Sequence, residues 1–199
     1  MKKIHHIVIS LFLTGILFAQ DNTTETPTLA TPAASSSDNA TIDIDFTLPE
    51  AASSGTVKMT FTHTSGTADG NAPHIITFTS DFETASQHTT TLNGSNLGAN
   101  ENVASATTDA LLEDGAIYTV KIEYQDEAGN TAAFATNSTF TYDITAPTIS
   151  STAPAQDASI KDTKVSYTLS EAVASGTVTF TRTGGSADGS SPHEQDLSG

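Results

Sequence analysis

Apolar and polar residues alternate along several stretches of this chain. In residues 41–48, TIDIDFTL, the apolar positions Ile42, Ile44, Phe46 and Leu48 share one face, while aspartate and threonine side chains lie on the other. A period of two is typical of a β-strand with one buried face. These segments are therefore predicted to be short strands. The same alternation recurs in residues 56–62, 74–80, 117–124 and 134–142.

Turn-forming residues separate the alternating stretches. Gly, Asn, Asp and Pro supply the backbone conformations of tight turns, and no long stretch shows the 3.6-residue period of a helix. Short strands separated by turns predict an all-β protein, built as an antiparallel β-sandwich. The turn clusters lie in residues 50–55, 65–73, 93–102, 112–116 and 126–130.

The N-terminal residues precede the alternating pattern. Residues 1–20 begin with Lys2 and Lys3, continue with an apolar run and end in small or polar residues, which is the layout of a secretory signal peptide. The apolar run is shorter than the roughly 20 residues that span a bilayer, so the mature chain is expected to be exported without a membrane span. Residues 21–40, rich in Thr, Ser, Ala and Pro, are predicted to be a linker leading into the first strand.

Charge and composition narrow the classes of partner. The chain has 7 basic and 23 acidic residues, and loss of the signal peptide with its two lysines takes the formal charge from −16 to −18. Phosphate binding depends on Lys and Arg contacts, so nucleic acid and anionic lipid are excluded as partners. The chain has no cysteine, hence no disulfide and no thiolate ligand. Its stability must come from a core, with or without bound ions.

A long internal repeat links the two ends of the chain. Residues 48–74, LPEAASSGTVKMTFTHTSGTADGNAPH, match residues 169–193, LSEAVASGTVTFTRTGGSADGSSPH. The offset is 121 residues between Glu50 and Glu171 but 119 between His74 and His193, so the first copy carries a two-residue insertion. A sandwich domain needs about 100 residues, so a period of this size suits a whole module.

The repeated module resembles a known family. Residues 142–185 are similar to the start of a bacterial Ig-like repeat, the kind arrayed in tandem in large secreted or surface-attached proteins. Residues 111–132 resemble the late strands of that module, including the tyrosine corner of Ig-like and fibronectin type III sandwiches. The resemblance implies that Tyr118 packs at a corner and hydrogen-bonds to nearby backbone through its hydroxyl. It also implies a spacer, stalk or adhesive role.

The resemblance divides the chain into unequal parts. Residues 27–145 are expected to form one complete Ig-like repeat, and residues 146–199 the N-terminal part of a second, truncated repeat. The second part contains no counterpart of GAIYTVKIEYQDEAGN. Half a sandwich exposes an apolar face and unpaired strand edges. Further repeats of the same chain are therefore expected beyond residue 199.

Residues that suggest an enzyme are sparse. The sequence has no nucleophile elbow, zinc helix motif or phosphate loop. Asp69 with His74, and Asp188 with His193, are conceivable metal or catalytic pairs, but a zinc site needs three or four ligands. Asp-Gly and Pro in this loop indicate a turn between two strands instead. Glu50 and Asp69 could be imagined as glycosidase carboxylates, although any acidic sandwich offers such pairs. We expect no enzymatic activity.

Calcium is the one candidate cofactor. Asp126, Glu127 and Asn130 of QDEAGN and Asp143 of YDITAP are expected near the end of the first repeat. Tandem Ig-like and cadherin-like repeats often hold Ca²⁺ at their junctions, and this cation takes six to eight oxygen ligands. The alternative is that DEAGN is a plain hairpin turn whose acids are solvated.

These observations favour a non-catalytic structural, spacer or adhesive module of a bacterial secreted or cell-surface protein. A calcium-rigidified adhesin stalk is one alternative. A carbohydrate-binding accessory module of a larger secreted enzyme is another, with a cell-surface or glycan partner. Sugar sites use exposed aromatic rings, and Phe82 is the ring that lies outside a clear strand.

Overall fold

Two compact units make up the structure. The computed structural model describes residues 20–197, and the chain divides between Ile144 and Thr145 into unit 1 and unit 2. The predicted signal peptide lies outside the described residues, apart from Gln20. Among residues 20–197 no helix is long and apolar enough to cross a membrane.

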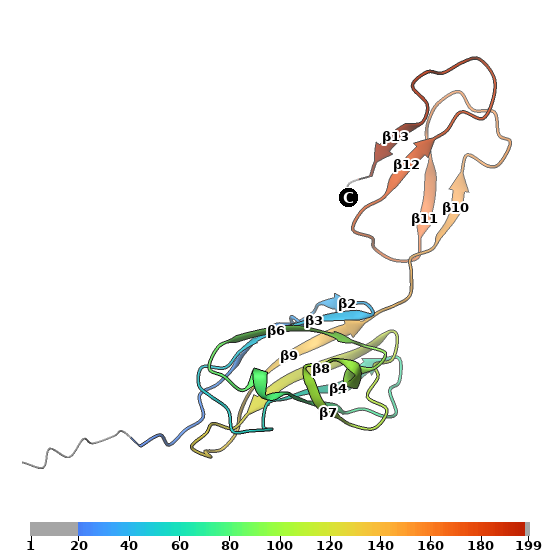
Figure 1. Ribbon diagram of the computed structural model, residues 1–199. Helices are drawn as coiled ribbons and strands as arrows, with labels where there is room; N and C mark the ends of the chain where they lie inside the picture. The colour runs from blue at the N-terminus through green and yellow to red at the C-terminus, as the bar shows by residue number, and fades with distance from the viewer. Residues whose placement is uncertain (1–19, 198–199) are drawn as a thin grey trace, which may run out of the picture. The chain divides into compact units, whose positions relative to one another are not determined.

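Unit 1 consists of two sheets (Figure 1). The smaller sheet has the order β1-β3-β6, and the larger has the order β2-β9-β8-β4-β5-β7. Neighbouring strands are antiparallel, except that β2 and β9 are parallel. The bounds are Thr28–Thr31 (β1), Ser37–Asp38 (β2), Thr41–Thr47 (β3), Lys58–Gly66 (β4), His74–Phe78 (β5), Gln87–Asn93 (β6), Val103–Ala106 (β7), Ala116–Tyr124 (β8) and Ala133–Tyr142 (β9), with short 3-10 helices at Ser80–Phe82 (η1) and Leu97–Ala99 (η2).

The core of unit 1 is built from the alternation seen in the sequence. Every second residue of β3 and of β8 is buried, so each strand turns one apolar face inward. Full burial of one such large side chain contributes about 1.5–3 kcal/mol. The expected all-β, antiparallel sandwich is confirmed. The inward residues of these two strands are Ile42, Ile44, Phe46, Ala116, Tyr118, Val120, Ile122 and Tyr124.

One strand of the core, β6, was not predicted from the alternation of apolar and polar residues. β6 lies in a segment with few apolar residues, yet it pairs with β3 along all seven of its residues. Its buried positions are His88 and Leu92, with Thr90 half-buried between them. Two of these three inward residues are polar, so hydrophobic periodicity alone does not detect the strand.

The segment expected to be a linker contains β1 and β2 and is fastened to β9. The Asn137 side chain donates to the carbonyls of Leu29 and Pro32, at 3.0 and 2.8 Å. Backbone bonds then connect residues 35–38 to β9 and to Asp143 directly after it, so backbone pairing orders this segment in spite of its polar composition. We call these contacts the β9 seam. The backbone bonds are Ser35 N to Ser138 O, Thr141 N to Ser36 O and Asp143 N to Asp38 O.

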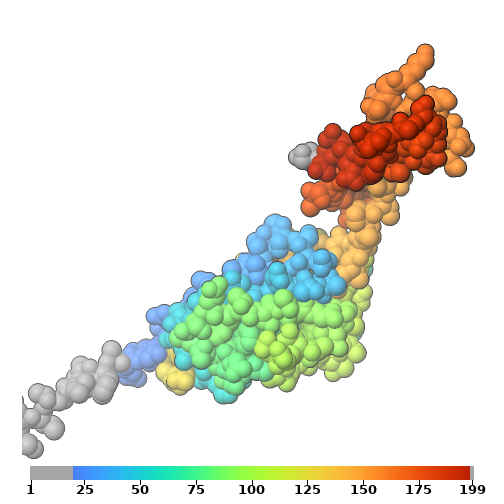
Figure 2. Space-filling model, turned by 45° about the horizontal axis from the view of Figure 1, so that its top comes forward, coloured from blue at the N-terminus to red at the C-terminus, as the bar shows by residue number. Residues whose placement is uncertain are grey.

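The chain enters and leaves unit 1 at opposite ends of β9. Tyr124, the last residue of β8, and Asp126, in the turn that follows it, hydrogen-bond to Glu25 and Thr24, so the first described residues lie beside the β8–β9 turn (Figure 2). The ten residues of β9 then cover about 33 Å. Ile144, just after β9, donates to the Asp114 carboxylate near the start of β8.

Unit 2 contains four strands in its described residues, in two antiparallel pairs. β12 and β13 reproduce the register of β4 and β5: Phe180 lies opposite His193 as Phe61 lies opposite His74. Gly66 and Gly185, at the ends of the matching turns, both have positive φ, at 79° and 80°. The internal repeat of the sequence is therefore a repeat of local structure. The strand bounds are Ile149–Ala153 (β10), Ser166–Leu169 (β11), Thr177–Phe180 (β12) and His193–Asp196 (β13).

Candidate functional site

The repeated Asp-His loop forms a buried cluster in unit 1. The Asp69 Oδ2 atom lies 2.7 Å from His74 Nε2 and accepts a hydrogen bond of 2.7 Å from the Tyr118 hydroxyl. The Asp69 Oδ1 atom accepts from the backbone N–H groups of Asn71 and Ala72, each at 3.1 Å. The carboxylate thus joins the β4–β5 turn to β8, and all its acceptor positions face protein donors.

Burial and hydrogen bonding set the electrostatics of this cluster. The side chains of His74 and Asp69 are 0% and 2% exposed. Burial by itself raises the pKa of Asp69, but the hydrogen bonds from Tyr118 and His74 outweigh it and hold that pKa below its usual range. Burial and the bond to Asp69 raise the pKa of Tyr118 well above its usual range. A charged Asp69 and a neutral Tyr118 are therefore the stable forms at neutral pH.

The geometry gives this cluster a structural role. The Tyr118 hydroxyl accepts a 2.9 Å hydrogen bond from the backbone N–H of Glu113, five residues upstream, as the tyrosine-corner resemblance implies. Its second bond, to Asp69, was not foreseen, because it joins positions 49 residues apart. Neither Asp69 nor His74 lines the cavities of about 420 and 320 Å³ in unit 1, which are bordered by residues 95–96, 98–99, 106–107 and 109–111 and by residues 40–41, 91–93 and 99–100. The buried positions of both side chains and the bond from Tyr118 fit the interpretation of this loop as a turn between two strands.

Unit 2 contains the same pair without the tyrosine. The Asp188 Oδ2 atom lies 2.8 Å from His193 Nε2, and Asp188 Oδ1 accepts from the backbone N–H of Ser190 at 3.0 Å. These two side chains are 56% (His193) and 39% (Asp188) exposed, whereas their counterparts in unit 1 are buried. The loop therefore builds its own Asp-His contact, and β8 supplies the cover in unit 1.

Three carboxylates converge where the chain enters unit 1. Oxygen atoms of Asp21, Glu50 and Asp126 lie within 4.8 Å of one another. The Tyr124 hydroxyl lies between this group and the incoming chain, donating to Glu25 O at 2.8 Å and contacting Glu50 Oε1 at 3.3 Å. The Glu25 N–H also donates to Glu50 Oε1. Hard cations such as Ca²⁺ prefer such oxygen groups.

The predicted calcium residues are divided between the two ends of β9. Asp126 and Asn130 meet: the Asp126 carboxylate accepts from the Asn130 backbone at 2.9 Å and from its side-chain amide at 2.7 Å. Burial raises the pKa of Asp126, but these bonds outweigh it and lower that pKa below its usual range. Glu127 lies in the same turn, bonded through its backbone N–H to Ala51 O. Asp143 follows the far end of β9, about 33 Å away, and cannot join them.

In the structure, Asp126 is grouped with Asp21 and Glu50, and not with Asp143. Asp21 and Glu50 approach Asp126 because the N-terminal segment folds back beside the β8–β9 turn. Residue 21 is far from residue 126 in the sequence, and nothing in the local pattern connects them. The recurrence of Glu50 as Glu171 in the repeat was the one sequence signal pointing to this glutamate.

Two further sequence hypotheses do not fit the geometry. Glu50 and Asp69 bond to Tyr124 and Tyr118, which lie six residues apart on β8, so about 20 Å separates these carboxylates. Glycosidase pairs stand within about 5–9.5 Å, so this pair is excluded. Phe82 is 6% exposed, with its ring stacked 5.0 Å from that of Phe78, so it offers no platform to a sugar.

Comparison with known proteins finds no relative of this chain: no family model matches it, and searches of curated proteins and of solved structures return no significant similarity.

Proposed function

We propose that this chain is a non-catalytic mechanical spacer, of the bacterial Ig-like kind, in a secreted or cell-surface protein. The observation that carries the proposal is the β9 seam together with the positions of the two chain ends in unit 1. The first strands of the unit are bonded to its last strand, and the chain enters at one end of that strand and leaves at the other. The internal repeat and the signal-peptide pattern support an exported protein built from such modules.

The direction of β2 relative to β9 determines how the seam carries load. Because the two strands are parallel and the chain ends point opposite ways, a pull on the ends slides β2 along β9. Their hydrogen bonds run across the strands and would be strained together instead of one after another. Such resistance suits a stalk or spacer, which transmits tension between its two ends.

Single-molecule force measurements test the mechanical function. The chain has no cysteine, so pairs of introduced cysteines define where force is applied. Attachment through Asp21→Cys and Thr145→Cys loads the seam in shear. Attachment through Asn39→Cys and Thr145→Cys pulls β2 and β9 apart from the same end and breaks their bonds singly. Unit 1 should unfold at a clearly higher force in the first geometry. Equal or lower force in the first geometry would refute a spacer function based on this seam.

Calcium-dependent stiffening is a second candidate function. The convergence of Asp21, Glu50 and Asp126 favours this function. Asp126 is only 1% exposed, so one carboxylate of the group is buried. A cation there would fasten the incoming chain at Asp21 to the β3–β4 loop and to the β8–β9 turn. Such a clamp would stiffen the point at which force reaches unit 1.

A further inference from the structure

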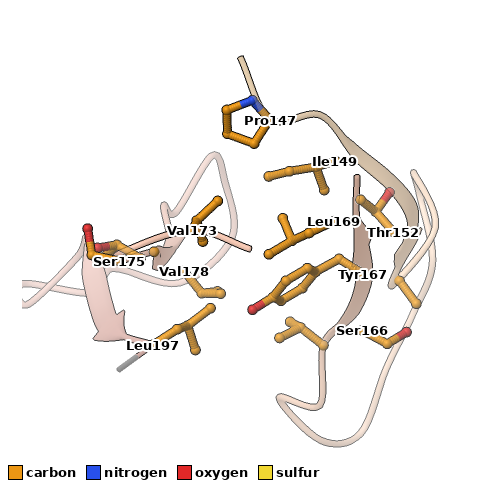
Figure 3. A pocket seen from close by; sticks show the side chains of 14 residues that line it. Pro147, Ile149, Thr152, Ser166, Tyr167, Leu169, Val173, Ser175, Val178 and Leu197 are labelled. Carbon is orange, nitrogen blue, oxygen red and sulfur yellow. The ribbon is translucent and has the colours of Figure 1, made fainter. Parts of the chain in front are cut away.

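Unit 2 has an open apolar face. The β10–β11 and β12–β13 pairs border a cavity of about 410 Å³, in which side chains from the two pairs point toward one another (Figure 3). Ile149, Tyr167 and Leu169 line one side, and Val178 and Leu197 line the other. Ile149 is 65% exposed and Tyr167 is 40% exposed. Large side chains at these values indicate a surface that fits another apolar element.

Unit 1 buries the equivalent surface and pairs β8 with the other edge of β4. Phe46, which matches Tyr167 in the repeat, and Met59, which matches Val178 in the register of β4–β5 and β12–β13, are fully buried there. In unit 1 the strand β4 pairs with β5 along one edge and with β8 along the other. β12 pairs with β13 in the register of β4 and β5, and among residues 20–197 no strand pairs with the other edge of β12.

Two carboxylates of unit 1 lie beside the tyrosine hydroxyls of β8. Asp69 accepts the hydroxyl proton of Tyr118. The Tyr124 hydroxyl donates to the Glu25 carbonyl at 2.8 Å and also lies 3.3 Å from Glu50 Oε1, which accepts the Glu25 N–H as well. Both tyrosines are fully buried and lie six residues apart on the inward face of β8, with Val120 and Ile122 between them.

Both carboxylates recur in unit 2. Asp188 takes the place of Asp69. Its Oδ2 atom contacts His193, the counterpart of His74, but no residue takes the place of Tyr118 among the described residues. Glu171 replaces Glu50, and its Oε1 atom is buried without a hydrogen-bond partner in the described part of the chain. A buried acceptor without a donor is unfavourable, so Glu171 marks the place of a donor that the proper occupant supplies.

We propose that the open face of unit 2 is an acceptor for an extended strand with the pattern Tyr-x-Val-x-Ile-x-Tyr. The strand pairs antiparallel with β12, packs its Val and Ile on the apolar face, and donates its tyrosine hydroxyls to Asp188 and Glu171. Strand addition to a sheet edge combines backbone bonds for affinity with side-chain pockets for specificity. A second copy of the same open face is a poor alternative, because it would bring Asp188 and Glu171 carboxylates together without donors. This inference does not depend on the mechanical function of unit 1.

A peptide with the sequence of residues 111–125 tests the proposal on the full chain. Titration of the isotope-labelled chain should show one-to-one binding, with chemical-shift changes gathered in β11, β12 and residue 171. A matched peptide in which both tyrosines are phenylalanine should bind at least about tenfold more weakly, since it lacks two hydrogen bonds to charged acceptors. Failure of the tyrosine peptide to bind, or equal affinity of the two peptides, would overturn the proposal.

Variants of the chain assign the second tyrosine. Glu171→Ala should weaken binding of the tyrosine peptide but leave unchanged the affinity of a peptide carrying only Tyr124→Phe, because both changes remove the same bond. Asp157→Asn, an exposed change in a turn of unit 2, is the control and should have no effect. Additive losses from Glu171→Ala and Tyr124→Phe would contradict the assignment. Self-association of the chain that protects unit 2 without peptide would show that a second copy is the occupant.

Covalent attachment of the strand to the chain makes the test independent of the solubility of the peptide. A copy of residues 111–143 joined after Gly199 by a flexible Gly/Ser linker raises the local strand concentration to about the millimolar range. The amides of β12 should then become protected from hydrogen exchange. A tethered copy with both tyrosines changed to phenylalanine should protect them less, and equal protection by the two copies would refute recognition through the hydroxyls.

Discussion

The Tyr118 hydroxyl donates to Asp69 Oδ2 across 2.7 Å and thereby ties β8 to the β4–β5 turn. The same hydroxyl accepts from the Glu113 backbone, so one side chain fixes two connections of the sandwich. The loop that the sequence predicts to be a turn, with a metal or catalytic pair as the alternative, thus anchors a structural corner. Stability measurements on this contact separate the two interpretations, because a structural corner affects folding and a catalytic site does not need to.

Removal of the Tyr118 hydroxyl should destabilise unit 1. Tyr118→Phe leaves Asp69 with one donor fewer and the Glu113 N–H without its acceptor, which costs about 1–3 kcal/mol of unfolding free energy. Urea unfolding followed by tyrosine fluorescence measures the change. Tyr142→Phe is the matched control, because the buried Tyr142 hydroxyl has no hydrogen-bond partner among the described residues. That variant should be neutral or slightly more stable, and a loss equal to that of Tyr118→Phe would contradict the assigned contacts.

Asp69 should make the stability of unit 1 fall in acid. Its pKa is lower in the folded chain than its ordinary value near 4, so its contribution is fully present above about pH 4 and is lost as the pH falls through the folded pKa. The difference in unfolding free energy between wild type and Asp69→Asn should therefore be largest near neutral pH and should shrink below about pH 4. Asp81→Asn, an exposed carboxylate in η1, is the control. If the difference between wild type and Asp69→Asn grew in acid, the pKa of Asp69 would be raised by folding and not lowered, and the assigned hydrogen bonds would be refuted.

The β9 seam should depend on Asn137. Asn137→Ala removes two side-chain hydrogen bonds to the Leu29 and Pro32 carbonyls and should lower the unfolding free energy of unit 1 by about 1–3 kcal/mol. It should also lower the shear unfolding force. The neighbouring Thr136 is exposed, so Thr136→Ala serves as the control on the same strand. Similar losses of unfolding free energy for both variants would show that alanine lowers the strand propensity of β9, and that the seam bonds of Asn137 are not the cause.

Calcium should stabilise unit 1 through Asp21, Glu50 and Asp126. Extracellular calcium modules have dissociation constants of about 10⁻⁴–10⁻³ M, so 10 mM Ca²⁺ should raise the unfolding free energy by roughly 1.4–2.7 kcal/mol. Asp21→Asn should abolish the gain, since Asp21 is the exposed member of the cluster. Asp143→Asn should leave it intact, because Asp143 lies at the other end of β9. An unfolding midpoint that does not move with Ca²⁺ would exclude the site.

Phe82 should behave as a core residue. Phe82→Ala leaves a cavity beside Phe46 and Phe78 and should cost about 3–5 kcal/mol of unfolding free energy. Phe134→Ala, at a position 57% exposed, should cost far less. Glycan binding that disappears in a fully folded Phe82→Ala variant would instead revive the carbohydrate-binding interpretation.

Local pattern was sufficient for most of the strands. The alternation at Ile42, Ile44 and Phe46 predicts β3, and that at Tyr118, Val120 and Ile122 predicts β8, because a strand with one buried face repeats its apolar residues every second position. β6 was missed because its inward positions include His88 and Thr90, whose burial depends on β3 and Phe82 being present. The segment before β3 was expected to be a linker because its order comes from backbone bonds to β9, which leave no trace in composition.

The sequence by itself determined the all-β architecture, the acidic and disulfide-free character, and the repeat that writes the Asp-His loop twice. Only the tertiary structure decided what that loop does. Asp69 meets Tyr118, and Asp21 meets Asp126, through folding that brings together residues far apart in the chain. Local periodicity reports which face of a strand is buried, because that depends on neighbouring residues. It cannot report which carboxylate receives a given hydroxyl, because that depends on the packing of the whole sandwich.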